Sequence, residues 1–362
     1  MADHLRVLLD CRMATWTGIG RYATGLAREL SHAEGIELIQ VIAEDEQPPA
    51  RAEAVSAAKH PFSMGGAREL ARIAEKAAPD VVHCTHFPTP VPAPHPLIVT
   101  LHDLTPLLVA GVMPSVFKRA AYRWWNIRAA ENADVILANS ENTAADIVHF
   151  FPAAAGKITV VEHTAEGFAD GPVGVLPLGL LGEGEPFLLS MGNTKAHKDL
   201  PTLLRAFSQI ASQQPRLRLL LVGSDEPGYA ESVLGDDLAA ARVAFTGRVG
   251  DETLRALYSK AAVFAFPSLY EGFGLPPLEA MAFGTPVVTS DAASLPEVVG
   301  DAALLFPAGD AGALAACLRS LLGDADLRAR LSAAGLVRAG ELTWARTTAE
   351  TIAAYRRVIG AS

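Results

Sequence analysis

Two glutamates flank a short glycine-rich stretch in the last third of the chain. Glu271 stands directly before Gly272 and Gly274, and Glu279 follows eight residues after Glu271. Glycines let backbone N–H groups approach a ligand closely, and Pro276 suits the first turn of a helix, whose free N–H groups and dipole favour an anion. The stretch is therefore typical of a loop that holds a phosphate between two carboxylates.

The residues around this loop predict a βαβ unit. The apolar run 263–266 predicts a buried strand, residues 276–282 predict a short helix that ends at Gly284, and residues 286–289 predict the next strand. Without this context, two glutamates at such a spacing are more often a solvated loop residue and a helix-surface charge.

The stretch 263–290 resembles the Glu-x7-Glu signature of the retaining glycosyltransferases of family 4. The shared segments are Glu-Gly-Phe-Gly-Leu-Pro at 271–276, Glu-Ala-Met-Ala at 279–282 and Gly-Thr-Pro-Val-Val at 284–288. The resemblance implies an α/β protein of the GT-B type: two Rossmann-like domains with doubly wound parallel sheets face a cleft that binds a nucleotide sugar. It also implies a C-terminal helix that crosses back to the first domain.

The same resemblance implies which residues contact the donor. Glu271 would hold hydroxyls of the donor sugar, Glu279 would accept the ribose hydroxyls, and the backbone at Val249, in Phe-Thr-Gly-Arg-Val, would bind the nucleotide base. A carboxylate can accept two neighbouring hydroxyls at once. The remaining donor contacts implied in the second domain are Asn193, Gly272, Phe273, Gly274 and Leu275.

A cation is expected near the donor, because stabilising the charge on a diphosphate leaving group should be the largest catalytic contribution. Residues 191–199, Met-Gly-Asn-Thr-Lys-Ala-His-Lys-Asp, follow a predicted strand at the turn that faces the ligand in doubly wound folds. They resemble the family segment Gly-x4-Arg-Lys-Asn, which maps the diphosphate-binding role onto Lys198. His197 replaces the Arg and Asp199 the Asn, and exposed lysines in a turn are the alternative.

The first domain offers a second set of candidates. Gly18 and Gly20 follow the first predicted strand, where doubly wound folds place phosphate-binding backbone. His102 ends another strand; the resemblance places it near the reacting centre, where its imidazole could donate to the sugar or the acceptor, and a structural role at the strand end is the alternative. Three further histidines either line the acceptor side or belong to the core: His83, His86 and His163.

Alternating strand and helix patterns predict two α/β domains, which 362 residues can fill. Strands are expected at 6–10, 36–42, 81–84, 97–102, 135–138 and 158–161 in the first domain, and at 187–191, 217–223, 243–246 and 263–266 in the second. The Gly- and Pro-rich segment 164–186 predicts a linker or hinge. We therefore divide the chain into residues 1–170, 171–345 and a C-terminal helix at 346–362, with helix breaks expected near Gly323 and at 335–342.

The bulk properties exclude several classes of protein. The net charge of −10 argues against nucleic-acid binding, and three distant cysteines suggest reduced thiols rather than disulfides or a metal site. Asp324-Ala325-Asp326 has the form of a metal motif, but helix capping explains it better. We expect no metal and no cofactor. Without a signal peptide or an apolar run of about 20 residues, a cytoplasmic location is expected.

Residues 115–130 combine aromatic and basic side chains and contain no acid. Such a helix can rest on an anionic membrane, at the inner face in this case, although aromatic residues are more often part of the core and basic residues part of a solvated face.

The favoured function is a metal-independent retaining hexosyltransferase that moves a sugar onto a glycan or lipid-linked acceptor in surface polysaccharide or glycolipid biosynthesis. By resemblance the donor is first GDP-mannose and second a UDP-sugar. The alternatives are a hydrolysing sugar-nucleotide 2-epimerase and a non-catalytic nucleotide-sugar-binding subunit.

Overall fold

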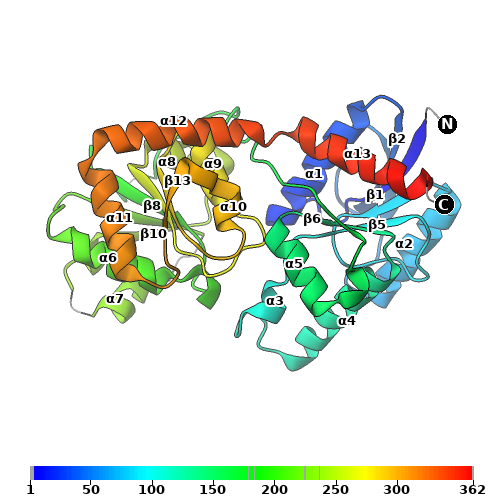
Figure 1. The fold of residues 1–362 in the computed structure, drawn as a ribbon, viewed down its shortest axis with the longest axis horizontal. Helices are drawn as coiled ribbons and strands as arrows, with labels where there is room; N and C mark the ends of the chain where they lie inside the picture. The colour runs from blue at the N-terminus through cyan, green and yellow to red at the C-terminus, as the bar shows by residue number, and fades with distance from the viewer. Residues whose placement is uncertain (1–3, 178, 183, 224–225, 236, 361–362) are drawn as a thin grey trace. The chain divides into compact units, whose positions relative to one another are not determined.

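The computed structural model describes residues 4–177, 179–182, 184–223, 226–235 and 237–360 (Figure 1). The chain forms two compact units. The first unit comprises residues 1–108, 113–163 and 343–362, and the second unit comprises 109–112 and 164–342. The sequence-based division placed the corresponding boundaries at residues 170 and 345.

The first unit is built around a seven-stranded sheet in which all pairings are parallel, in the order β3-β2-β1-β4-β5-β6-β7. Its strands are β1 (Leu5–Asp10), β2 (Ile36–Ala43), β3 (Glu53–Ala57), β4 (Val81–Cys84), β5 (Leu97–Leu101), β6 (Val135–Ala138) and β7 (Ile158–Val160). Its helices are α1 (Thr17–His32), α2 (Met64–Ala77), α3 (Thr105–Leu108), α4 (Val116–Asn132), α5 (Glu141–Phe150) and α13 (Trp344–Gly360).

The second unit contains a six-stranded parallel sheet in the order β10-β9-β8-β11-β12-β13. Its strands are β8 (Phe187–Met191), β9 (Arg218–Val222), β10 (Val243–Gly247), β11 (Val263–Phe266), β12 (Val287–Ser290) and β13 (Ala303–Phe306). Its helices are α6 (Leu200–Ala211), α7 (Tyr229–Leu234), α8 (Asp251–Lys260), α9 (Leu275–Ala282), α10 (Leu295–Val299), α11 (Ala311–Gly323) and α12 (Ala325–Glu341).

Each sheet is buried on both faces, as the apolar strands require. In β1, Leu8 belongs to one hydrophobic cluster, whereas its neighbours Val7 and Leu9 belong to another. In β8, Leu188 and Leu189 divide in the same way between two clusters. The prediction of two doubly wound α/β domains is therefore confirmed.

The strand order identifies where each sheet can bind a ligand. In both sheets the first strand of the unit lies beside a strand that follows it by two or more elements, β1 beside β4 and β8 beside β11. In doubly wound sheets the loops that leave two such strands turn to opposite sides, and ligands bind at the carboxyl ends of these strands. The loops after β8 and β11 carry Asn193, Lys198 and the glycine loop that begins at Glu271, whereas Val249 follows β10 and Glu279 lies in α9.

Helix α13 packs on the first unit, where it contacts α1. Gly25 of α1 allows the close approach, because a Cβ atom at this position would stand 2.0 Å from the ring of Trp344. Tyr355 is fully buried, and its hydroxyl lies 2.7 Å from Nδ1 of His83 in β4.

The structure departs from the expected elements in three places. The strands β3 and β13, both at sheet edges, were not predicted. The break expected near Gly335 is absent, because α12 continues through it to Glu341. Gly335 serves packing instead, since a Cβ there would approach Cγ of Met281 to 3.1 Å.

Helix capping accounts for the Asp324 motif, as predicted. The side chain of Asp324 accepts a hydrogen bond of 2.8 Å from the backbone N–H of Leu327, at the start of α12. Ser63, Ser140 and Asp310 cap α2, α5 and α11 in the same manner.

Candidate active site

Lys198 and Glu271 meet at the carboxyl edge of the sheet in the second unit. Lys198 lies in the loop after β8 and Glu271 in the loop after β11, and Nζ of Lys198 donates to Oε1 of Glu271 over 2.5 Å. The side chains are 18% and 16% exposed, so water or a ligand reaches both. The ammonium also lies 5.3 Å from the ring centre of Phe266. The structure thus brings together the two predicted residues of opposite charge.

Backbone contacts fix the geometry of this ion pair. The carbonyl of His197 accepts hydrogen bonds from the N–H of Leu269, at 2.7 Å, and from Oγ of Ser268, at 2.9 Å. These bonds join the loop that carries Lys198 to the loop that carries Glu271. Gly192, with φ of +158°, leaves room at the start of the first loop, where a Cβ would stand 3.3 Å from Cγ of Lys198.

The side chain of Ser294 anchors the glycine loop before α9 by two hydrogen bonds to its backbone. Its hydroxyl lies 2.9 Å from the carbonyl oxygen of Glu271 and 2.6 Å from that of Phe273. Gly274 adopts φ of +115°, and a Cβ there would approach Leu295 to 2.8 Å, so both conformation and packing require glycine. Gly272 and Leu275 lie on either side of these anchored residues.

The start of α9 has fewer N–H groups than the sequence pattern suggested. Pro276 and Pro277 occupy its first turn and carry no N–H, which removes two of the donors that a helix N-terminus usually offers. An anion at this helix would depend on the backbone before Pro276 and on the helix dipole.

Glu279 is a buried carboxylate and not a helix-surface charge. It is 3% exposed, and the hydroxyl of Tyr258 in α8 donates to its Oε2 over 2.9 Å. Tyr258 is itself fully buried and packs against Phe264 and Phe283. The carboxylate therefore has a fixed orientation, which suits a group that receives hydroxyl donors.

Asn193 and Val249 occupy other parts of the same edge. Asn193 lies in the loop after β8, where its side-chain oxygen accepts from the N–H of Lys195 over 3.1 Å. Val249 follows β10, the edge strand of the sheet, and packs against a hydrophobic cluster of the second unit.

In the first unit, Gly18 and Gly20 lie within the first turn of α1. A Cβ at Gly20 would stand 2.3 Å from the carbonyl oxygen of Ala14, so Gly20 is needed for packing of the preceding loop. A Cβ at Gly18 would meet nothing within 4 Å. Of the two glycines, only Gly18 has no structural reason to be glycine.

His102 lies at the carboxyl end of β5, and its Nε2 is 2.8 Å from the carbonyl oxygen of Thr85. Burial lowers the pKa of His102, although the bond to Thr85 opposes this effect. In the neutral ring the N–H must point to Thr85, because a carbonyl only accepts. Nδ1 is then an acceptor, so His102 can receive a hydroxyl hydrogen but cannot donate one.

Four histidines of the first unit have lowered pKa values, and three of them, His86, His102 and His163, lie at this edge. His102 lies 5.1 Å from His163 and 5.7 Å from His86 between ring centres, and Tyr22 stacks on His163 at 4.6 Å. Burial lowers the pKa of His86 and His163, and it lowers the pKa of His83 to about 3. His83 bonds to Thr100 and Tyr355 and belongs to the core.

Comparisons with known proteins identify the family. Residues 179–337 match the family described as Glycosyl transferases group 1, and residues 16–164 match Glycosyltransferase Family 4. The chain is 30% identical over 277 residues to the O-antigen chain mannosyltransferase B of Escherichia coli, covering 73% of this chain and 71% of that protein. The chain is a glycosyltransferase.

Further relatives of this glycosyltransferase agree. It is 28% identical over 306 residues to the serotype-specific mannosyltransferase WbdA of Escherichia coli, covering 79% of this chain but 38% of that longer protein. Sucrose-phosphate synthase from Thermosynechococcus elongatus superposes with a TM-score of 0.78 at 22% identity, over 99% of this chain and all of that one. This structural match supports the GT-B type of fold.

Sequence reasoning missed a second ion pair of the glycosyltransferase. In the first unit, the guanidinium of Arg12 contacts both carboxylate oxygens of Asp10, at 2.8 and 2.6 Å, and donates to the carbonyl of Gly66 at 3.1 Å. The two side chains are 1% and 2% exposed. The signal in the sequence was Asp-Cys-Arg at 10–12, which begins with the last residue of the first strand.

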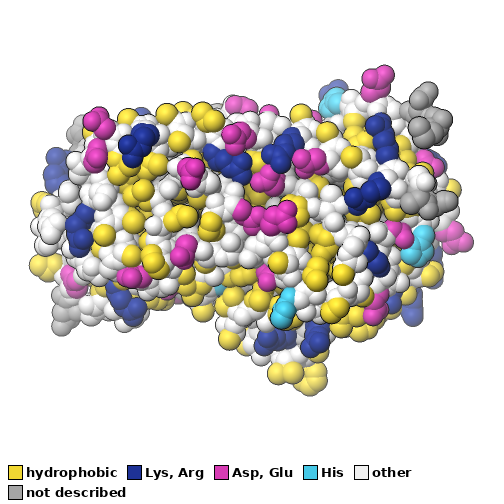
Figure 2. All heavy atoms as spheres, in the orientation of Figure 1, with side chains coloured by type: hydrophobic (Ala, Val, Ile, Leu, Met, Phe, Trp, Pro, Cys, Tyr) yellow, Lys and Arg dark blue, Asp and Glu magenta, His cyan; other side chains and the backbone are white. Residues whose placement is uncertain are grey.

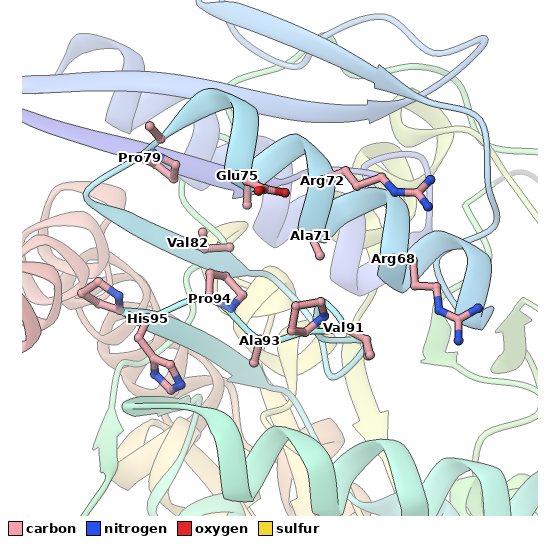
Figure 3. Close-up of a pocket in the computed structure, with 14 residues that line it drawn as sticks. Arg68, Ala71, Arg72, Glu75, Pro79, Val82, Val91, Ala93, Pro94 and His95 are labelled. Atoms are coloured by element: carbon pink, nitrogen blue, oxygen red, sulfur yellow. The ribbon is translucent and has the colours of Figure 1, made fainter.

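A pocket of about 710 Å³ lies between α2 and the proline-rich loop 91–96 (Figure 3). Pro79 and His95 line it, and both precede strands, β4 and β5. The pocket is therefore at the amino ends of the strands, opposite to the edge at which doubly wound sheets bind ligands. We do not assign it to the transfer reaction.

Within the described ranges, no group of three or more His, Cys, Asp or Glu residues is arranged to hold a metal ion. The same residues include no helix with the length and apolar character needed to cross a bilayer.

Proposed function

We propose that this hexosyltransferase moves mannose from GDP-mannose, with retention of the anomeric configuration, onto a glycan or lipid-linked acceptor of surface polysaccharide biosynthesis. The observation that carries the proposal is the Lys198–Glu271 pair at the carboxyl edge of the second unit. Two relatives with matching sequence over most of this chain are named mannosyltransferases, which favours mannose. A UDP-sugar is the second candidate for the donor.

In this proposal the second unit holds the donor. Lys198 stabilises the charge that develops on the leaving diphosphate, and the glycine loop with the dipole of α9 adds to this stabilisation. Glu271 receives hydroxyls of the transferred sugar. Glu279, fixed by Tyr258, receives the ribose hydroxyls.

The ion pair suggests how the site selects a complete donor. Lys198 and Glu271 neutralise each other, so an anion that binds Lys198 must compete with the carboxylate. A nucleotide sugar offers both a diphosphate for Lys198 and hydroxyl donors for Glu271, so it satisfies both partners of the broken pair. A nucleoside diphosphate without sugar satisfies only one of them.

The first unit is proposed to receive the acceptor. Because Nδ1 of His102 is an acceptor in the neutral ring, it can orient a hydroxyl by receiving its hydrogen. The proposed substrates both present hydroxyls, so this role fits the sugar as well as the acceptor glycan.

We further propose that transfer needs no divalent metal, since Lys198 and the α9 loop supply the positive charge. We expect product formation from GDP-mannose, with a mannoside acceptor, to survive exhaustive EDTA treatment, and NMR of the product to show the retained anomer. Activity that returns only after Mg²⁺ or Mn²⁺ is added would refute the proposed charge compensation. An inverted product would refute the retaining mechanism.

A thermal-shift screen with GDP-mannose, UDP-glucose, GDP and UDP tests the donor. A ligand at 100 times its dissociation constant stabilises the protein by about 2.7 kcal/mol. We expect the largest shift with GDP-mannose, and a larger shift with either nucleotide sugar than with its free diphosphate. A larger shift with UDP-glucose would reassign the donor.

A further inference from the structure

Helix α4 separates its aromatic and apolar residues between two environments. Tyr122 and Trp125 are buried against the core of the first unit. Phe117 is 88% exposed, Val116 is 77% exposed and Trp124 is 43% exposed. One face of the helix therefore packs against the core of the first unit, whereas its outer surface exposes large apolar side chains to solvent.

The exposed apolar residues form a stripe. Phe117, Ala121 and Trp124 follow one another at spacings of four and three, which places them on one side of a helix. All three are exposed. Exposed apolar residues that gather in one patch, unlike scattered ones, are a feature of interaction sites.

Cations surround the stripe. Lys118, Arg119 and Arg123 are exposed, and the guanidinium of Arg128 lies 5.3 Å from the ring centre of Trp124. No Asp or Glu occurs between Leu104 and Ala130, although the whole chain carries a net charge of −10. In Figure 2, hydrophobic and basic side chains gather at the lower edge of the first unit, where Figure 1 labels α4. This local charge opposes the charge of the rest of the protein.

We propose that α4 docks on an anionic lipid bilayer, with Val116 and Phe117 inserted among the acyl chains and the cations at the phosphate headgroups. Apolar groups at the tip of a helix, with Lys and Arg beside them and Trp at the boundary, match the depth profile of a membrane interface. The negative charge of the remaining surface favours an orientation in which only this region approaches the lipid. The contact does not depend on the proposed donor or acceptor.

Vesicle flotation with the full chain tests this proposal. We expect binding to phosphatidylcholine vesicles that contain phosphatidylglycerol, weaker binding at high salt, and little binding to phosphatidylcholine alone. The variant Val116→Ser/Phe117→Ser should lose at least about tenfold in partitioning, because it removes the buried apolar area. In the variant Lys118→Gln/Arg123→Gln, partitioning onto the anionic vesicles should fall about fivefold for each cation removed.

A matched control is available in the second unit. Val175 and Leu238 are 78% and 87% exposed, close to the values for Val116 and Phe117, so Val175→Ser/Leu238→Ser removes a comparable exposed apolar area elsewhere. We expect this control to bind vesicles like the wild type. Circular dichroism should show that all variants are folded, since the substituted side chains lie outside the core.

Fluorescence supplies a second measurement. Lipids brominated on the acyl chains should quench the tryptophan emission of the wild type, and less so that of Trp124→Phe. Absence of binding to the anionic vesicles, equal binding by the Val116→Ser/Phe117→Ser variant, or equal loss in the control would each overturn the proposal. The first of these outcomes would favour an acidic protein surface as the partner of α4.

Discussion

The two sheets of this glycosyltransferase each carry an ion pair at the carboxyl edge: Asp10 and Arg12 lie at the end of β1 and in the loop after it, whereas Lys198 and Glu271 join the loops after β8 and β11. Arg12–Asp10, in the first unit, is 1% and 2% exposed and is bound further by the carbonyl of Gly66. Lys198–Glu271, in the second unit, is 18% and 16% exposed. The pair in the first unit is therefore shielded from solvent, whereas a ligand can reach the pair in the second unit.

The difference shows how one architecture can serve two purposes. The donors and acceptors of a buried bidentate pair are satisfied within the protein. The Arg12–Asp10 pair therefore fixes the loop after β1 and has few donors or acceptors available to a ligand. A pair with a flexible lysine near solvent can exchange its partner for a substrate group. We therefore expect disruption of the first pair to affect stability and disruption of the second to affect turnover.

The largest effect on stability is expected for Arg12→Ala. Removing one partner leaves the Asp10 carboxylate buried and unpaired, which should cost about 3 to 5 kcal/mol. All four tryptophans lie in the first unit, so their fluorescence during urea unfolding reports this unit alone. Arg68→Ala, at an exposed site on α2, is the control and should change little. A stability loss below about 1 kcal/mol would place Arg12 among ordinary surface pairs.

Glu271→Ala should give the largest effect on turnover. We expect kcat to fall by at least about 10²-fold, because a contact to the reacting sugar is removed. The fold should persist, with a modest loss of stability, since the pair is partly exposed. Glu231→Ala, an exposed glutamate of α7, should keep full activity. Near-normal turnover of Glu271→Ala would remove this carboxylate from the mechanism.

Nucleotide affinity should respond with opposite signs to changes in the two partners. Lys198→Ala should weaken GDP binding by about 1.5 to 3 kcal/mol, the range for hydrogen bonds to charged groups. Glu271→Gln should strengthen GDP binding, because Lys198 no longer has a competing carboxylate. Calorimetry measures both, with the exposed Lys195→Ala as control. Weaker GDP binding in Glu271→Gln would contradict the exchange of partners.

Acidification should also distinguish the two units. Burial lowers the pKa of His83 to about 3, and it also lowers the pKa of His86, His102 and His163. The unfolded chain binds these protons near pH 6.5, so the first unit is most stable above that value and loses stability as the pH falls toward 3. Tryptophan fluorescence should change at a higher pH than the far-ultraviolet circular dichroism of the whole chain. Coincident transitions would argue against a separate acid-sensitive unit.

The sequence determined much of the second unit. The strand at 263–266 was predicted with its observed bounds, and the predicted helix at 276–282 begins one residue earlier, at Leu275. Short apolar runs bounded by Gly and Pro predict buried parallel strands well, because both faces of such strands are covered. The edge strand β3, Glu-Ala-Val-Ser-Ala, escaped prediction, since one side of it lacks a neighbour and its pattern is weak.

Tertiary structure alone decided the environment of individual side chains. On α4, Phe117 and Trp124 are exposed while Tyr122 and Trp125 are buried, although all four are aromatic residues of one helix. Which face a helix buries depends on the sheet and helices that pack against it, and these are distant in the sequence. The same reason separates Arg12–Asp10 from Lys198–Glu271. Residue type and position near a strand end suggested Lys198 and Glu271 as charged site residues. Only the tertiary packing, such as the contact of Arg12 with Gly66, decided how much solvent reaches each pair.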